Sequence, residues 1–318
     1  MMDSIDLKIL QTLEKDIVSG ETLAKNFGLS RTAIWKRIKK LESLGYKFEH
    51  KKEGYRLIEK SLYLLENEIK QFLKTKLIGK KYIWFETLDS SNIYAKENNL
   101  EEGTVVVAEQ QTAGKGRKGR KWVSLPLKGI YFSIVLKPKI TIDKLLQISL
   151  LFPLAIRKTI ENFGVNANIK WPNDVYINGK KVSGTLIETD IELSDVKKLI
   201  VGIGINVNYS KEDFKDIKDI ATSLLIEKGE AINRKKFFGE LLNNIEDYYF
   251  KFLENKINPV EEVDKYLLWK GEKVKIIDDE KIYEGIFKGL NEYGGIKLDI
   301  NGEEKNFYTG DLSLRVAK

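Results

Sequence analysis

The sequence predicts an α+β multidomain protein: a winged helix-turn-helix domain (residues 1–62), a mixed α/β domain (63–268) and a small C-terminal barrel (269–318). Three observations predict this division. The length of 318 residues is about twice that of a usual single domain. Positive charge gathers in the first 60 residues, which hold 13 Lys and Arg against 9 Asp and Glu, a net charge of +4. Short β-rich runs separated by turn residues fill the end of the chain.

The composition excludes several classes of chemistry. With no cysteine and one histidine, His50, the chain cannot form disulfides, thiolate metal sites or a multi-histidine metal site, and a Ser–His triad is disfavoured. The start MMDSIDLK lacks the order of a signal peptide, and the longest apolar stretch, 145–156, is too short to span a membrane. We therefore expect a cytoplasmic protein with no structural metal and no membrane contact.

Three short helices are predicted at the start of the chain. Apolar residues at helical spacing follow Ser4, which we expect to cap the first helix. The second helix is expected between Ser19, a typical N-cap, and Gly28, a typical C-terminal residue. The third follows Ser30 directly, so the two are joined by a short turn, as in a helix-turn-helix.

The third helix is expected to present cations and hydroxyls away from its apolar stripe. After it, residues 46–58 predict two strands around a basic turn, which would form a wing with His50 at its surface. The span 20–39 resembles the helix-turn-helix of bacterial winged-helix regulators, so we expect DNA binding; a solvated lysine face is the alternative. Trp35 either packs on the first helix or stacks against DNA. The expected DNA contacts are Arg31, Thr32, Trp35, Lys36, Lys39, Lys51 and Lys52.

The central region predicts alternating strands and helices. Strands are expected at 82–87, 104–110, 129–136, 167–171 and 199–207. Helices are expected near 65–78, 91–99, 142–163 and 234–255, and Pro153 should kink or divide the third of them. Asn178-Gly179 lies between β-rich runs and predicts a type I′ hairpin that places Lys181 opposite Tyr176.

A glycine-rich basic loop follows the second strand. Residues 115–121 hold five cations and no acid, with glycine at 114, 116 and 119. This spacing matches the G-x-G-x-x-G dinucleotide fingerprint, but that fingerprint requires a helix here, whereas the following residues predict a loop and a strand. A flexible basic loop can instead close over a phosphate-bearing ligand. A solvated surface loop would account for the charge but not for the glycines.

Three further motifs follow in order: KWPND at 170–174, KVSGTLIE at 181–188 and GIGIN at 202–206. With the basic loop, they resemble the signature motifs of biotin–protein ligases, whose catalytic domain has the biotin/lipoate ligase fold. With the helix-turn-helix, the whole chain resembles a bifunctional ligase and biotin operon repressor. The last domain resembles the SH3-like C-terminal domain of that family.

The resemblance implies a biotin–[acetyl-CoA-carboxylase] ligase. Such an enzyme joins biotin to AMP with Mg-ATP, releases pyrophosphate, and passes the biotinyl group to a lysine of a biotin carboxyl carrier domain. Biotin and ATP are its substrates, and Mg²⁺ accompanies ATP. In regulatory members, biotinyl-AMP is also the corepressor that promotes homodimerisation and binding to operator DNA.

The resemblance also assigns site residues. Arg117 and Lys181 are implied to be catalytic, because their charges can stabilise the transition state at the α-phosphorus. Ser91 replaces the family's threonine and keeps the hydroxyl, whereas Lys115 replaces the common arginine and keeps only the charge. The implied contacts with biotin and biotinyl-AMP are Ser90, Ser91, Asn92, Gln111, Gly114, Lys115, Gly116, Arg117, Trp122, Lys181, Gly184, Gly204 and Asn206.

Other residues keep two interpretations. Asn173 or Asp174 either orients Mg²⁺ or a lysine, or forms a structural turn. Trp171 is expected to pack beneath the site, and Arg315 either reaches the ligand loop or is a surface cation. Two other functions compete with the ligase: a biotin-sensing regulator with weak or no ligase activity, and a lipoate-type ligase. Retention of both Arg117 and Lys181 argues against the first, and the helix-turn-helix argues against the second.

Overall fold

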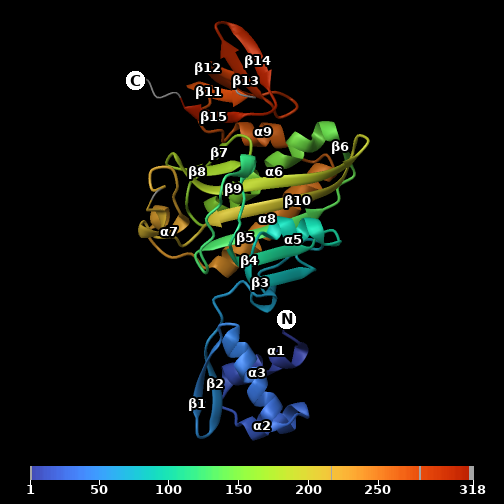
Figure 1. Cartoon of the computed structure of the whole chain (residues 1–318), viewed down its shortest axis with the longest axis vertical. Coiled ribbons are helices and arrows are strands. Elements are labelled where there is room, and N and C mark those ends of the chain that lie inside the picture. Colours follow the sequence, from blue (N-terminus) through green and yellow to red (C-terminus); the bar gives the residue numbers. More distant parts are fainter. Residues whose placement is uncertain (1, 216, 279–280, 315–318) are drawn as a thin grey trace. The chain divides into compact units, whose positions relative to one another are not determined.

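The computed structural model describes residues 2–215, 217–278 and 281–314. They form two compact units, one ending at Gln71 and the other beginning at Phe72, shown with their elements in Figure 1. The three-domain division at 62 and 268 stays a prediction. Within the described ranges, no helix combines the length and the apolar character needed to cross a membrane.

The first unit is a winged helix-turn-helix. Leu13, Ile34 and Ile38 lie at the centre of its core and are fully buried. The two strands pair antiparallel and form the predicted wing, on which His50 is exposed and contacts Glu42 (2.7 Å). The elements are α1 (Ser4–Lys15), α2 (Gly20–Phe27), α3 (Arg31–Ser43), β1 (Lys47–Lys51), β2 (Gly54–Glu59) and α4 (Glu66–Lys70).

Local sequence signals set the ends of these helices. Ser19 and Ser30 cap α2 and α3 as predicted, and Gly28 ends α2 with φ 64°, a left-handed conformation that favours glycine. The predicted cap at Ser4 is wrong. Asp3 caps α1 instead, because its carboxylate accepts two backbone N–H groups while the Asp6 carboxylate accepts the N–H of Asp3.

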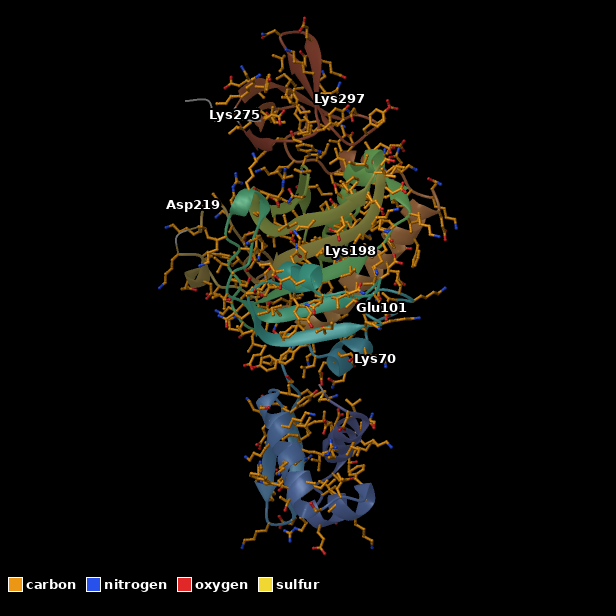
Figure 2. The ribbon with its side chains drawn as sticks, turned by 45° about the vertical axis from the view of Figure 1, so that its right-hand side comes forward. Lys70, Glu101, Lys198, Asp219, Lys275 and Lys297 are labelled. Carbon is orange, nitrogen blue, oxygen red and sulfur yellow. The ribbon has the colours of Figure 1, made fainter. Side chains whose placement is uncertain are left out.

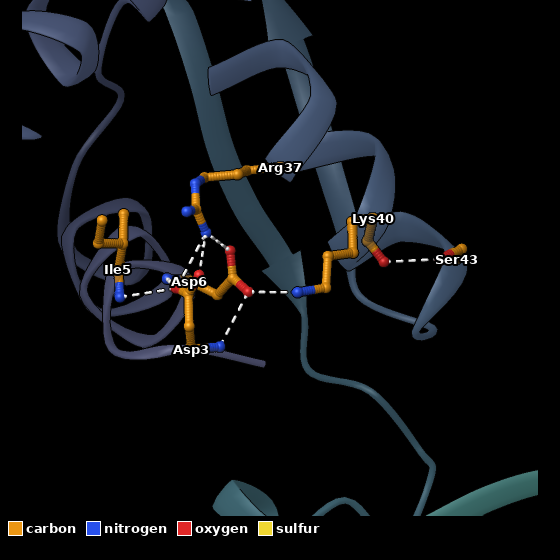
Figure 3. Close-up of polar contacts among 6 residues, drawn as sticks. All are labelled: Asp3, Ile5, Asp6, Arg37, Lys40 and Ser43. Atoms are coloured by element: carbon orange, nitrogen blue, oxygen red, sulfur yellow. Dashed lines mark hydrogen bonds and ion pairs between the residues drawn. The ribbon is translucent and has the colours of Figure 1, made fainter. Parts of the chain in front are cut away.

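A buried carboxylate joins α1 to α3 (Figure 3). The Asp6 side chain is fully buried and lies 2.5 Å from Arg37 Nη1 and 2.7 Å from Lys40 Nζ. Burial raises the pKa of Asp6, but hydrogen bonds from Lys40, the Asp3 N–H and Arg37 outweigh it and hold the pKa below its usual 3.8. Asp6 therefore pairs with two cations of α3, of which Arg37 also pairs with Asp3 (2.8 Å), and ties that helix to α1.

The second unit is built on a mixed sheet with the strand order β3-β4-β5-β10-β9-β8-β7. Only β3 and β4 pair in parallel along that path, and the short β6 also pairs with β10. Its strands are β3 (Tyr82–Leu88), β4 (Val105–Gln111), β5 (Gly129–Leu136), β6 (Ile140–Thr141), β7 (Asn168–Lys170), β8 (Asp174–Ile177), β9 (Lys180–Glu192) and β10 (Asp195–Asn206).

Helices cover both faces of this sheet (Figure 1). Val135 of β5 packs with Ala95 of α5 on one face, while Phe132 of the same strand makes an edge-to-face contact with Phe238 of α8 on the other. The predicted hairpin is confirmed, since Asn178 and Gly179 both have positive φ and Lys181 stands opposite Tyr176. The helices are α5 (Ser91–Glu97), α6 (Leu145–Asn162), α7 (Leu224–Lys228), α8 (Arg234–Leu253) and α9 (Pro259–Asp264); α6 continues through Pro153 undivided.

The predicted helix at 65–78 is wrong beyond residue 70. Its second half is held from α8 instead: the backbone N–H groups of Leu77 and Ile78 donate to Glu246 Oε2 at 2.8 and 2.7 Å. The N–H of Lys74 donates to Asn243 Oδ1 at 2.7 Å. These distant partners satisfy the donors that a helix would have used.

The end of the chain forms an antiparallel sheet of order β14-β13-β12-β11-β15. Its Phe287 and Leu298 share one hydrophobic core with Leu154 and Trp171, whose indole N–H donates to the Gly294 carbonyl (2.8 Å). Trp171 is therefore a core residue, as expected, and its core is the one shared with the C-terminal sheet. The strands are β11 (Lys273–Asp278), β12 (Lys281–Leu290), β13 (Ile296–Ile300), β14 (Glu303–Phe307) and β15 (Asp311–Leu314).

Candidate active site

The sheet is hollowed on the face that packs against α5. Gly184 of β9 stands opposite Gly204 of β10. A β-carbon on Gly204 would lie 2.5 Å from Trp122 Nε1, and one on Gly202 would overlap the Asn92 side chain. These glycines therefore leave the room in which Trp122 and Asn92 stand, and they open a cleft above the sheet.

Most of the residues that the sequence predicts to contact the ligand line this cleft. Two of the thirteen expected residues lie outside its lining: Gly114, whose carbonyl accepts the N–H of Trp122 (2.9 Å), and Asn206, which is buried and donates to the Thr222 carbonyl (3.0 Å). The other eleven line it: Ser90, Ser91, Asn92, Gln111, Lys115, Gly116, Arg117, Trp122, Lys181, Gly184 and Gly204.

The start of α5 presents polar groups in a fixed arrangement. The backbone N–H and the hydroxyl of Ser91 lie 2.8 and 3.1 Å from Gln111 Oε1 and donate to it. Asn92 donates to Glu188 Oε2 (3.0 Å) and accepts from Ser133 Oγ (2.5 Å). Because these side chains are held by one another, a ligand meets a preorganised polar wall.

Two cations face this wall with different partners. Arg117 Nη1 donates to the neutral amide oxygen of Asn173 (3.3 Å). Lys181 Nζ lies 2.7 Å from Asp174 Oδ1 and 5.5 Å from the centre of the Trp122 ring. Asp174 therefore lies beside a lysine, which is one of the roles that the sequence left open for it, the other roles being to orient Mg²⁺ or to form a structural turn.

Polar atoms without hydrogen-bond partners gather in this cleft. Across the described ranges, four buried side-chain polar atoms lack such a partner, and three of them belong to the lining residues Trp122, Asp174 and Thr185. The contact between Asp174 Oδ1 and Lys181 is an ion pair by distance but does not have hydrogen-bond geometry. Since buried polar atoms are normally satisfied, this concentration indicates a site that receives polar ligand atoms.

The backbone beside Trp122 is held by two buried tyrosines. The Tyr131 and Tyr209 hydroxyls bond to each other. Tyr209 also accepts the N–H of Leu125 (2.9 Å) and donates to the Val123 carbonyl (3.1 Å). Burial raises the pKa of Tyr131 and Tyr209 above the usual value, so both keep their protons.

The basic loop has no helix of the kind a dinucleotide fingerprint requires. Arg117–Gly119 forms a single 3-10 turn in which Lys118 has φ 55°. The Gly116 N–H donates back to the Arg120 carbonyl (2.7 Å), which closes the loop on itself. This geometry excludes the dinucleotide-binding interpretation and leaves a closed cationic loop beside the cleft.

The first unit presents a second cationic surface on α3 and the wing. The seven residues expected to contact DNA are all exposed, and Trp35 keeps half of its surface accessible. Trp35 is therefore not packed into the core of its unit. Arg37 and Lys40 of α3 contact Asp6 instead.

Comparisons with known proteins cover nearly the whole chain. Residues 6–56 match an HTH domain, 84–206 the Biotin/lipoate A/B protein ligase family, and 271–315 the Biotin protein ligase C terminal domain. The bifunctional ligase/repressor BirA of Bacillus subtilis is 37% identical over 315 residues, which are 97% of each chain. The chain belongs to this bifunctional ligase/repressor family. BirA of Escherichia coli is 28% identical over 99% of each chain.

The fold agrees with a solved structure of a related ligase. The biotin protein ligase from Aquifex aeolicus, solved in complex with biotin and ATP, is 37% identical with a TM-score of 0.64. It covers 75% of this chain, and the chain covers all of it.

Sequence reasoning missed several lining residues of this bifunctional ligase/repressor. The alternation in the GIGIN motif could have found Gly202, because residues two apart share a face of a strand. The neighbouring Thr185 and Leu186 carry no comparable signal. Lining residues not assigned to the ligand site were Arg120, Phe132, Asn173, Asp174, Thr185, Leu186, Gly202 and Ile203. Arg315 lies outside the described residues.

Proposed function

We propose that the chain is a biotin–protein ligase that activates biotin with Mg-ATP and also acts as a biotin-responsive transcriptional repressor. One observation carries the ligase proposal. A glycine-hollowed cleft brings Arg117 and Lys181 together with three buried polar atoms that have no hydrogen-bond partner. Family membership over 97% of the chain supports both activities.

The first step is nucleotidyl transfer. A carboxylate oxygen of biotin attacks the α-phosphorus of ATP, the bond to the bridging oxygen breaks, and pyrophosphate leaves with Mg²⁺. Both substrates are anions, so cations are needed to reduce their repulsion and to stabilise the charge that develops at phosphorus. We assign this role to Arg117 and Lys181. No side-chain nucleophile is required, which agrees with a chain that lacks cysteine.

The second step is acyl transfer. The neutral amine of a lysine on a biotin carboxyl carrier domain attacks the carbonyl carbon of biotinyl-AMP, an amide forms as the bond to the phosphate oxygen breaks, AMP leaves, and the proton of the amine passes to solvent. The adenylate must stay bound until that lysine arrives. The free space in the cleft measures about 90 Å³, so we expect the loop at 114–121 to move outward for the adenylate to enter and to close over it afterwards.

The ligase proposal is tested with biotin, Mg-ATP and an acceptor carrier domain, by following biotinylation by mass spectrometry. Transfer of biotin supports the proposal. Absence of transfer under saturating conditions would instead favour a biotin-sensing regulator. Transfer of lipoate in preference to biotin would favour a lipoate-type ligase.

The repressor proposal rests on the exposed cations of α3 and the wing. We propose that biotinyl-AMP promotes homodimerisation and that the dimer binds operator DNA through two copies of α3. Operator affinity and sedimentation should be measured with and without biotin and ATP. Deleting residues 1–60 should abolish operator binding and leave ligation intact, whereas loss of both would show that the ligase unit depends on the first.

A further inference from the structure

A second cleft lies at the far end of the sheet from the candidate active site. It is bounded by the connection from β5 to β6, the start of β10 and the end of α8, and it holds about 620 Å³. Asp195 opens β10 there, whereas Gly204 lies nine residues on, about 30 Å along an extended strand. This cleft is therefore separate from the biotin and adenylate site.

Positive charge dominates the rim of the cleft. Four lysines and one aspartate line it, which gives a net charge of +3. Lys197 lies 3.3 Å from Asp195 and 3.8 Å from Glu192. Within the part of the chain that the structure describes, no carboxylate pairs with the side chains of Lys137, Lys139 or Lys144. Clefts lined by one sign of charge concentrate ions of the opposite sign.

The lysines are not needed to cap the end of α8. The carbonyls of Phe250, Lys251 and Phe252 already accept the backbone N–H groups of the three residues that follow the helix. Their hydrogen-bonding capacity at this end is therefore met within the backbone. The end of α8 therefore does not account for the lysines that line the cleft.

The floor of the same cleft is apolar. Ile140 and Leu253 are half-buried and supply its accessible apolar surface. Pro138, Val196 and Phe252 are buried and pack behind them. A volume of this size with apolar walls and a few directed charges is typical of small-molecule sites.

We propose that this cleft binds a small organic anion that carries an apolar portion, with its carboxylate or phosphate between Lys139 and Lys144 and its hydrocarbon against Ile140 and Leu253. Neither inorganic phosphate nor an uncharged alkyl chain satisfies both surfaces. The inference does not depend on the proposed ligase activity.

The test uses the full chain saturated with biotin and Mg-ATP, so that the first cleft is filled. Hexyl phosphate is titrated by isothermal calorimetry, with inorganic phosphate and hexanol as separate probes. Hexyl phosphate should bind at one site, about tenfold or more tightly than either of the other two. Equal binding of inorganic phosphate would overturn the role of the apolar floor, and equal binding of hexanol would overturn the role of the cations.

Charge reversal locates the site. The Lys139→Glu, Lys144→Glu double variant should weaken hexyl phosphate binding by about tenfold or more, while pyrophosphate release from biotin and ATP stays unchanged and reports an intact fold. Lys297→Glu is the matched control, since Lys297 lies on the C-terminal sheet (Figure 2) and should leave binding unchanged. Wild-type binding by the double variant would refute the proposal.

Discussion

Replacing Gly204 by alanine tests whether the cleft depends on the position of Trp122. The added β-carbon would lie 2.5 Å from Trp122 Nε1 and 2.8 Å from Cζ2. Unstrained carbon contacts are about 3.5–4.0 Å, so the indole must move by about 1 Å. A shift of that size in a substrate-positioning group costs up to about 10²-fold in rate.

We therefore expect kcat/KM for pyrophosphate release to fall by about 10- to 100-fold, or about 1.4–2.7 kcal/mol of transition-state stabilisation. The free energy of unfolding in urea should change by less than ~1 kcal/mol, because the ring can move into the open cleft rather than strain the core. The Gly204→Ala, Trp122→Ala double variant supplies the control. If the clash is the cause, the double variant matches Trp122→Ala alone. Wild-type kcat/KM in Gly204→Ala, or losses that simply add in the double variant, would refute the reasoning.

Three other variants test the remaining charges. Arg117→Gly should release biotinyl-AMP early, seen by mass spectrometry as biotin on bystander lysines; unchanged adenylate retention would contradict its role. Lys181→Ala should raise the barrier to adenylate formation by a few kcal/mol, so that its rate falls by about 10²-fold or more. Operator affinity should fall less, and equal losses of both would indicate misfolding. Asp6→Asn leaves Arg37 and Lys40 without their buried partner. We therefore expect the free energy of unfolding of the first unit, measured in urea at pH 7, to fall by about 1–3 kcal/mol. The loss should be smaller than for a fully buried pair, because both cations are partly exposed. Because the pKa of Asp6 is lowered in the folded state, its contribution to the free energy of unfolding is full above the usual pKa of 3.8 and disappears as the pH falls through the lowered pKa. If the Asp6→Asn variant lost stability at acidic pH in the same way as the wild type, this role of Asp6 would be ruled out.

What the sequence predicts well is what a few neighbouring residues determine. Ser30 and Gly28 mark helix ends because a cap needs only the adjacent backbone. The helix prediction was wrong for residues 71–78 because N–H groups in this segment donate to side chains about 170 positions away. No local sequence pattern indicates such distant partners. The same division holds for the site: the motifs located its cations and the alternation of GIGIN could have indicated Gly202, but no sequence signal indicated that Thr185 and Leu186 line the cleft.

The partners of the cations explain how one chain uses positive charge in two places. On α3, Asp6 pairs with Arg37 and Lys40, and Glu42 pairs with Lys39 (2.8 Å). Within the described residues, Arg31 and Lys36 are the cations of that helix that no carboxylate pairs with, so they are the ones most available to a polyanion. In the cleft, Arg117 bonds to the neutral amide of Asn173, so it is oriented without losing its charge. Lys181 does face a carboxylate, but at a geometry that leaves Asp174 Oδ1 without a hydrogen bond. An incoming phosphate can therefore compete for Lys181 more easily than it could for a well-bonded ion pair. The net charge of +7 thus matters less than which cations carboxylates leave available.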